Sequence, residues 1–232
     1  MYIVVIEMKK DIIIRKDKIN DVLSQKMYRR LFGEESQDQF QPFCFLILNI
    51  EEEDAREKIA DIFLDLFNES AILYINEKPV IFYVTDQGYE VKNLLWSIID
   101  DFGMKVSIFN SGKINSQEAF LIIYDLYERY LSMEKYHYYG VGELVLEIIK
   151  KDMHELQKYR KVLLNNIAED PQIEKLILAM FDNNLNVTKT AREVYMHRNT
   201  INNKLEYIKK ETGMNIQEFK DAVSMYWLIK SK

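Results

Sequence analysis

Amide and cationic side chains gather on one predicted helical face near the C-terminal end of the sequence. Between residues 184 and 213, apolar side chains recur at Ile201, Leu205 and Ile208, the spacing of one face of a helix. At about 100° per residue, the face opposite these three is polar. Its residues are Asn199, Asn202, Asn203, Glu206 and Lys210, with Arg198 at the exposed N-terminal end.

These side chains match the chemistry of DNA. Asn can pair bidentately with adenine and Arg with guanine, whereas hydroxyl and ammonium groups suit phosphate oxygens. We predict base contacts from Arg198, Asn199, Asn202 and Asn203, and phosphate contacts from Thr188, Lys189, Thr200 and Lys204. His197, directly before Arg198 in the chain, completes the set of predicted DNA-binding residues.

Two helices are needed to present this polar face. Asn186 can cap the first, a short amphipathic helix from Val187 to Val194, because its side-chain oxygen can accept a bond from an amide of the first turn. Tyr195 and Met196 then form a tight connection.

The second helix begins after His197, which occupies an N-cap position, and ends at Gly213. The order predicts a helix-turn-helix with a recognition helix from about Arg198 to Lys210. On spacing alone, an ordinary helical hairpin with a solvated polar face is an equal alternative.

The same stretch, TAREVYMHRNTINNKLEYIKKETG, followed by FKDAVSMYWLIK, closely resembles the C-terminal domain of PucR/CdaR-type bacterial transcriptional regulators, which is itself similar to the Fis-like helix-turn-helix. The residues that match are Thr190-Ala191, His197-Arg198-Asn199-Thr200, Leu205, Ile208 and Thr212-Gly213. The family usually has an aromatic residue followed by Arg where this chain has Asn203 and Lys204. The DNA sequence bound by relatives is therefore not transferred to this chain.

Composition limits the protein class. The chain has 232 residues, of which 48% are apolar and 29% charged, enough for one large or two small soluble domains. No apolar run reaches the roughly 18 residues that a membrane span needs, and charges interrupt the N-terminal segment where a signal peptide would be apolar. Cys44 is the single cysteine, which excludes an intramolecular disulfide and favours the cytoplasm.

Charge is divided along the chain. Residues 171–232 hold eight Lys and two Arg against two Asp and five Glu, a net charge of +3. Because the whole chain carries −6, the remainder carries −9. This division is typical of a regulator with a basic output domain and a separate acidic input domain.

Residues 42–139 predict an α+β domain. Strands are expected at 43–50, 71–75, 80–84 and 105–109, with helices at 54–68, around 91–99 and after Asn115, whose side chain would cap the last one in a capping box with Glu118. The order β-α-β-β-α-β-α is that of ferredoxin-like and nucleotide-cyclase palm folds, with helices on one face of the sheet.

By this order of elements, the segment resembles the degenerate GGDEF-like domain that precedes the helix-turn-helix in PucR/CdaR-type proteins. An active cyclase needs glycines and metal-binding acids at its central hairpin. Here that hairpin reads Asn76-Glu77-Lys78-Pro79, so the resemblance implies a noncatalytic domain.

The remaining segments complete the predicted domain order. In an N-terminal part, 1–41, we expect a hairpin of strands 2–6 and 12–15, a helix ending near Gly33 and a loop at 34–41. In a helical connector, 140–170, we expect two helices broken near Asp152. A supporting helix at 172–181 then begins the DNA-binding domain, 171–232.

Other chemistries find little support. His137, His154 and His197 lack metal-ligand spacing, so no metal, cofactor or catalytic residue is assigned. A group of tyrosines is interpreted as core and partly exposed interface rather than as the lining of a ligand pocket. It comprises Tyr124, Tyr127, Tyr130, Tyr136, Tyr138 and Tyr139.

The sequence therefore predicts a homodimeric regulator that binds double-stranded DNA and responds to an unknown small-molecule effector, with no enzymatic activity. Two alternatives remain open. One is a nucleotide-binding or nucleotide-processing protein built on the palm-like domain, and the other is a protein-interaction module that has lost DNA binding.

Overall fold

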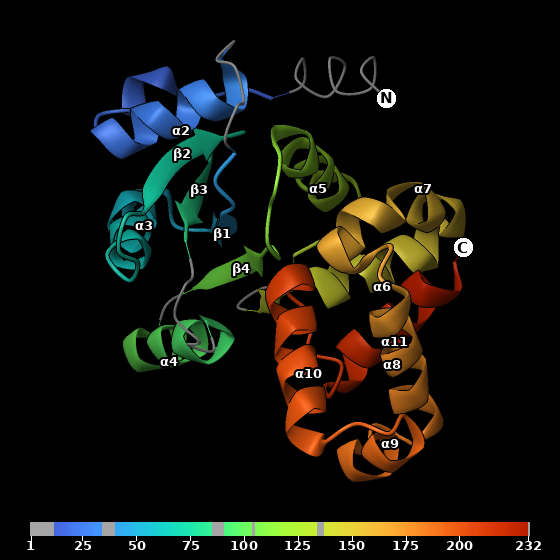
Figure 1. Cartoon of the computed structure of the whole chain (residues 1–232). Helices are drawn as coiled ribbons and strands as arrows, with labels where there is room; N and C mark the ends of the chain where they lie inside the picture. The colour runs from blue at the N-terminus through green and yellow to red at the C-terminus, as the bar shows by residue number, and fades with distance from the viewer. Residues whose placement is uncertain (1–11, 34–39, 85–90, 104, 134–136, 232) are drawn as a thin grey trace. The chain divides into compact units, whose positions relative to one another are not determined.

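The structure is a computed structural model that describes residues 12–33, 40–84, 91–103, 105–133 and 137–231 (Figure 1). The chain divides into two compact units. The sheet unit comprises residues 1–125 and 132–139, and the helical unit comprises residues 126–131 and 140–232. The predicted strand at 2–6 and most of the predicted loop at 34–41 lie outside the described residues.

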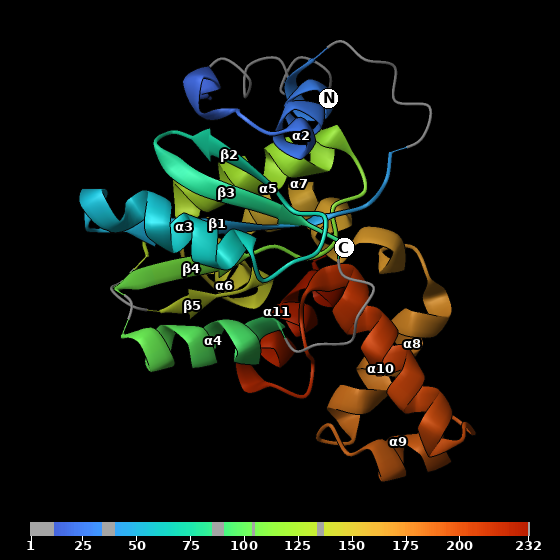
Figure 2. The same ribbon diagram turned by 90° about the vertical axis from the view of Figure 1, so that its left-hand side faces the viewer.

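The sheet unit confirms the predicted α+β class. Its strands lie in the order β2-β3-β1-β4-β5, and all neighbours are antiparallel except β4 and β5 (Figure 2). The β-α-β-β-α-β order is that of a ferredoxin-like fold, to which β5 adds a short parallel edge. The strands are β1 (Cys44–Ile50), β2 (Ala71–Ile75), β3 (Lys78–Tyr83), β4 (Val106–Asn110) and β5 (Tyr138–Tyr139).

The hairpin between β2 and β3 is tighter than the sequence predicted. Asn76 and Glu77 alone form the turn, with φ angles of 48° and 63°, as a two-residue turn of type I′ requires. Lys78 and Pro79, expected in the turn, belong to β3. Pro79 is tolerated there because β1 pairs with β3 only from Val80 onward, so no sheet bond needs its missing N–H.

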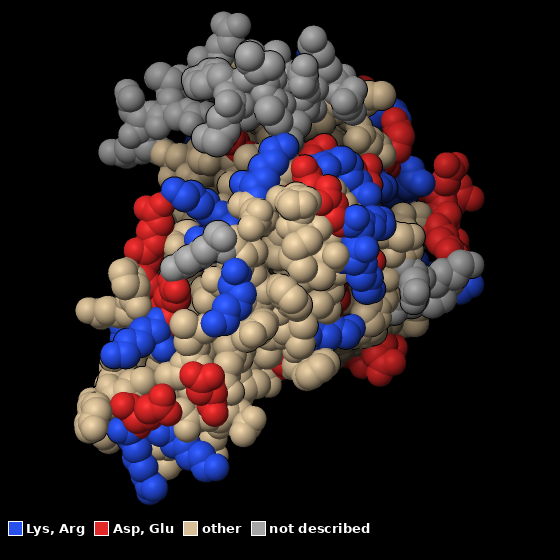
Figure 3. Space-filling model, turned by 90° about the vertical axis from the view of Figure 1, so that its right-hand side faces the viewer, with Lys and Arg blue, Asp and Glu red and all other residues tan. Residues whose placement is uncertain are grey.

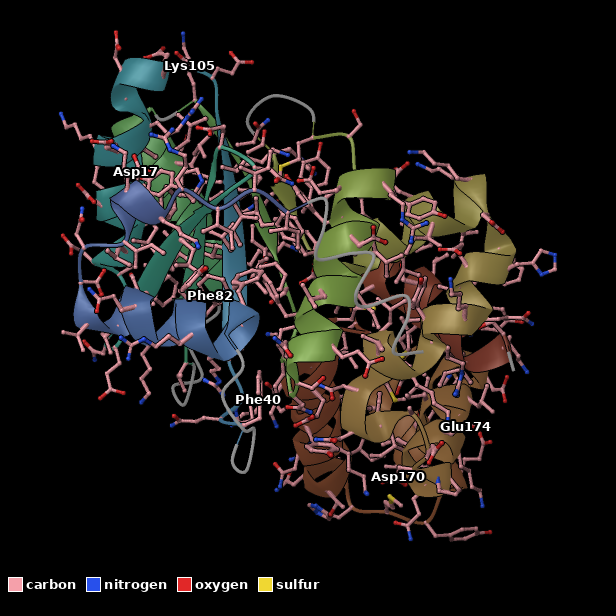
Figure 4. All side chains as sticks on the ribbon, turned by 90° about the horizontal axis from the view of Figure 1, so that it is seen from above. Asp17, Phe40, Phe82, Lys105, Asp170 and Glu174 are labelled. Carbon is pink, nitrogen blue, oxygen red and sulfur yellow. The ribbon has the colours of Figure 1, made fainter. Side chains whose placement is uncertain are left out.

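Helices cover both faces of the sheet, whereas the sequence predicted one. Helices α3 (Arg56–Leu64) and α4 (Val91–Phe102) share one core with β1, through residues such as Phe63 and Leu95. On the other face, Phe120 of α5 (Gln117–Tyr130) packs against Phe45 and Phe82, with ring centroids 5.2 and 5.6 Å apart; Figure 4 labels Phe82.

This second cover follows from the composition of β1. The strand buries consecutive residues from Phe45 to Leu48, so its side chains point into both faces and each face needs an apolar partner. Helix α2 (Val22–Phe32) supplies part of that partner, since the ring of Phe32 meets that of Phe120 at 6.2 Å.

Helix α5 begins one residue later than its predicted cap implies. The amide of Ala119 donates to Ser116 Oγ at 3.0 Å, so Ser116 rather than Asn115 caps the helix. Both residues are good caps by type, and the choice between them depended on how the chain leaves β4.

The predicted tyrosine group is core wherever it is described. Tyr124, Tyr127, Tyr130, Tyr138 and Tyr139 are all buried, and Tyr136 lies outside the described residues. Tyr138 also accepts a bond from Asn110 Nδ2 at 2.9 Å, while Asn110 Oδ1 accepts from Tyr83 at 2.7 Å. Burial raises the pKa of Tyr83, which keeps its hydroxyl neutral as a donor.

The helical unit contains the predicted connector and the C-terminal helices. Asp152 separates the first two, because it ends α6 through its amide and caps α7 by accepting from the His154 amide at 2.9 Å. Asp170, labelled in Figure 4, caps α8 by accepting from the amides of Gln172 and Ile173. The helices are α6 (Val141–Lys151), α7 (Met153–Leu164), α8 (Pro171–Asp182), α9 (Val187–Glu193), α10 (Arg198–Thr212) and α11 (Phe219–Lys230), with a 3₁₀ turn η3 (Asn165–Ile167) after α7.

Polar contacts join the connector helices to α11. Ser224, fully buried, donates to the Gly142 carbonyl at 2.7 Å, and a Cβ at Gly142 would lie 1.9 Å from an oxygen of Asp221. Arg160 of α7, only 8% exposed, donates from Nε to the Leu228 carbonyl at 2.8 Å and from Nη1 to the Ala168 carbonyl at 3.3 Å. The connector helices thus form one packed body with the C-terminal helices.

Removing this arginine should loosen the helical unit. We expect Arg160→Met to lower the free energy of unfolding by about 2–4 kcal/mol, because two buried carbonyls lose their donor. Lys161→Met, at the exposed neighbouring position, is the matched control and should have little effect. Urea unfolding measures both, and equal losses in the two variants would contradict this role for Arg160.

Candidate nucleic-acid interface

Helix α9 begins as the sequence predicted. The Asn186 side chain accepts from the Lys189 amide at 3.0 Å, which satisfies one unpaired N–H of the first turn. Thr190, fully buried, donates its hydroxyl to the Asn186 carbonyl at 3.0 Å. Thr188 and Lys189 therefore project from a fixed first turn into solvent.

The turn after α9 has the 6→1 hydrogen bond and the left-handed residue of a Schellman motif. The Met196 amide donates to the Ala191 carbonyl at 3.0 Å, and Tyr195 between them has a φ angle of 54°. This reversal leads directly into α10, and Figure 1 shows α9 at the lower end of α10.

Helix α10 has both predicted ends. His197 Nδ1 accepts from the Asn199 amide at 3.2 Å, and Gly213 ends the helix with a φ angle of 74°. Ile201, Leu205 and Ile208 are 0%, 7% and 0% exposed, which confirms that this face is core.

The opposite face is free for a partner. Eight of the nine predicted DNA-binding residues are exposed, and Lys204 is half-buried. The exposed eight are Thr188, Lys189, His197, Arg198, Asn199, Thr200, Asn202 and Asn203. Two come from the first turn of α9, and the other six lie at or beyond the start of α10. One of the six, His197, also has a structural task as the cap.

Buried polar contacts fix the far end of α10. Glu211, 3% exposed, accepts from Asn166 Nδ2 at 2.8 Å, and Asn165 Nδ2 donates to the Glu211 carbonyl at 3.2 Å. These contacts tie α10 to η3. The sequence pattern gave no sign of them, because Glu211 lies outside the apolar stripe.

The charges of the helical unit are unevenly distributed. Helices α9 and α10 carry six cations against three acids, and one of these acids, Glu211, is buried. In Figure 3, blue side chains lie at the lower end, the level at which Figure 1 places α9. A groove of about 630 Å³ beside α8 is instead lined by more acids than cations. Its acids are Glu169, Glu174, Asp182 and Glu193.

Phosphate would be repelled by that acidic groove and attracted to the exposed face of α9 and α10. Within the described residues, no three His, Cys, Asp or Glu side chains gather closely enough to hold a metal ion. No helix in the described ranges is both long and apolar enough to cross a membrane.

Comparisons with known proteins identify the type of this domain. Residues 175–230 match the family model of the PucR C-terminal helix-turn-helix domain, which spans most of α8 through α11. The segment is therefore a PucR-type helix-turn-helix, a domain of DNA-binding transcriptional regulators, rather than an ordinary helical hairpin. The predicted resemblance is confirmed at this domain.

One longer protein and one solved structure are also similar. Over 85 residues the chain is 28% identical to "Uncharacterized protein YxkF" of Bacillus subtilis (strain 168), a match covering 37% of this chain and 28% of that protein. The chain thus aligns with little more than a quarter of its relative. The crystal structure of a regulator of polyketide synthase expression from Bifidobacterium adolescentis matches with 13% identity and a TM-score of 0.37, covering 93% of this chain and 94% of that one.

The His197 cap can be tested apart from any DNA contact. We expect His197→Ala to reduce the free energy of unfolding by about 1 kcal/mol, because the Asn199 amide loses its acceptor. His197→Asn retains a side-chain acceptor at this position and should restore most of the loss. Chemical denaturation compares the three proteins, and an unchanged stability in His197→Ala would show that the ring does not cap α10.

Proposed function

We propose that this protein is a sequence-specific DNA-binding transcriptional regulator of PucR/CdaR type, in which α10 enters the major groove of double-stranded DNA. The observation that carries the proposal is the exposed polar face of α10 within a PucR-type helix-turn-helix. In this role the protein works in the cytoplasm, where the DNA is.

Base reading is assigned to the first two turns of α10. The four residues so assigned, all exposed, are Arg198, Asn199, Asn202 and Asn203. Among the described residues, none of their side chains makes a hydrogen bond or ion pair that DNA binding would have to break. Arg can donate two bonds to guanine, and Asn can pair with the donor and acceptor of adenine. Asn199, Asn202 and Asn203 lie on the face away from the core, and Arg198 lies at the exposed N-terminal end of the helix. Four such side chains can specify a few base pairs.

Phosphate contacts are assigned to residues on both helices. Thr188 and Lys189 come from the first turn of α9, and Thr200 and Lys204 come from α10. Contacts from two helices fix the register and angle of the recognition helix, although they carry no sequence information.

We propose a homodimer because one helix-turn-helix domain is small. A single recognition helix contacts few base pairs. Two identical domains placed one turn of DNA apart contact a longer site with two-fold symmetry. The effector is proposed to be an unidentified small molecule.

The proposed domains are an N-terminal part (1–41), an input domain (42–139), a connector (140–170) and a DNA-binding domain (171–232). We assign the input domain as GGDEF-like and noncatalytic. Its hairpin turn consists of Asn76 and Glu77, whose side chains occupy space that glycines would leave to a nucleotide phosphate.

The cations near that hairpin are already engaged. A cavity of about 310 Å³ there is lined by Arg15 and Lys18, among others. Arg15 pairs with Asp17 and Glu77, at 2.8 and 3.0 Å, and Lys18 pairs with Glu57. These pairs would compete with a triphosphate, which disfavours the alternative of a nucleotide-processing enzyme. Incubation with GTP and magnesium tests it, since any dinucleotide product would overturn the noncatalytic assignment.

Removing a base contact and removing a phosphate contact should change the binding of DNA in different ways. We expect Arg198→Ala and Asn203→Ala each to cost about 1–3 kcal/mol in binding and to relax one position of the site. Lys189→Ala should weaken binding to all sequences alike and reduce the salt dependence by about one phosphate contact. Selection of genomic DNA fragments on each protein, followed by titration at several salt concentrations, separates these outcomes.

The assay also tests the proposed function as a whole. If the folded wild-type protein selects no DNA motif, with or without candidate effectors, the helix-turn-helix serves another role, such as binding a protein. If Arg198→Ala loses the same affinity for every DNA sequence, Arg198 contacts phosphate rather than a base.

The dimer gives a separate prediction. Sedimentation of the protein with its selected DNA should show two chains per site, with half-sites about 10 base pairs apart. A complex of one chain that retains full specificity would contradict the dimer.

A further inference from the structure

Tyr195 combines an unfavourable backbone with an exposed side chain. Its φ angle of 54° is one that L-residues adopt at a cost of roughly 1–2 kcal/mol, and glycine adopts it freely. Its side chain is 96% exposed, the most exposed of the large hydrophobic side chains in the described ranges. The ring therefore contributes almost no burial that would offset the backbone cost.

Several other residues with positive φ have visible reasons for their side chains, although the exposed Glu69, with a φ angle of 54°, does not. Asn184 is of a type that tolerates this conformation, and Leu185 beside it is half-buried. Glu77 forms an ion pair with Arg15 at 3.0 Å. Tyr195 differs, because a large ring is held at a strained position while pointing into solvent. Backbone strain of this kind gathers at functional sites.

The position of the ring suggests what it meets. Tyr195 lies in the turn that leads into α10, two residues before His197 and three before Arg198. An extended chain spans at most about 3.6 Å per residue, so its Cα lies within roughly 11 Å of that of Arg198. A helix that enters the major groove by its N-terminal end brings the preceding turn towards the sugar-phosphate backbone at the groove edge.

We propose that the Tyr195 hydroxyl donates a hydrogen bond to a phosphodiester oxygen at the edge of the groove that α10 enters. The contact is uncharged and independent of sequence, and it positions the recognition helix rather than reading a base. The inference rests on the proposed function and adds to it a residue outside both helices.

The test removes first the hydroxyl and then the whole side chain, in the full-length protein. Tyr195→Phe should weaken binding about tenfold, both to the selected DNA and to unrelated DNA, with an unchanged salt dependence. Tyr195→Gly should lose at least as much affinity while its melting temperature rises, because the backbone strain is relieved. Tyr226→Phe is the matched control, since it removes the same atom from a 41% exposed tyrosine on α11, and it should bind as the wild type does.

Four other results would each contradict the proposed contact between Tyr195 and phosphate. If Tyr195→Phe binds as tightly as the wild type, the hydroxyl makes no phosphate contact. A loss confined to one base of the site would assign Tyr195 to base reading instead. A melting temperature that falls in Tyr195→Gly would mean that the ring serves the fold. If the wild-type protein itself binds no DNA, the proposed function fails, whereas wild-type binding with an unaffected Tyr195→Phe rejects this inference alone.

Discussion

Burial of the apolar stripe on α10 is the constraint on which the candidate interface depends. Ile201, Leu205 and Ile208 are removed from water, and each fully buried aliphatic side chain contributes about 1.5–3 kcal/mol. Because side chains on a helix have fixed directions, this burial also determines which residues point outward. Arg198, Asn202 and Asn203 are presented to solvent as a consequence of the core, with no separate structure to hold them.

A rotation about the helix axis is therefore prevented by the core, and a shift along it is prevented at the ends. His197 caps the start of α10, Gly213 allows its end, and the buried Glu211 joins that end to Asn166 of η3. Since η3 follows α7, α10 is attached to the connector helices as well as to α9. The helical unit thus presents its polar face from a packed body, in which Arg160 links α7 to the end of α11. A rigid support of this kind lowers the ordering cost of binding.

The sheet unit follows a different rule. Its central strand β1 is buried on both faces, so helices must cover both. The hairpin where a nucleotide cyclase would need glycines and metal-binding acids instead has a two-residue turn with ion-paired neighbours. The sheet unit thus has the β-α-β-β-α-β order of elements, but its hairpin lacks those glycines and acids, and an order of elements does not by itself imply a function.

The sequence by itself determined the features that depend on neighbours within one helical turn. The caps Asn186 and His197, the stop at Gly213 and the inward stripe of α10 were predictable because periodicity and capping are local. Tertiary structure alone decided the features that need distant partners. Ser116 replaced Asn115 as a cap, Pro79 joined a strand, and a second layer of helices covered the sheet. Glu211 and Arg160 were buried because partners 45 and 68 residues away in the chain accept or donate their hydrogen bonds. No local pattern encodes such pairs, since burial of a polar group is favourable only once the folded chain has brought its partner to it.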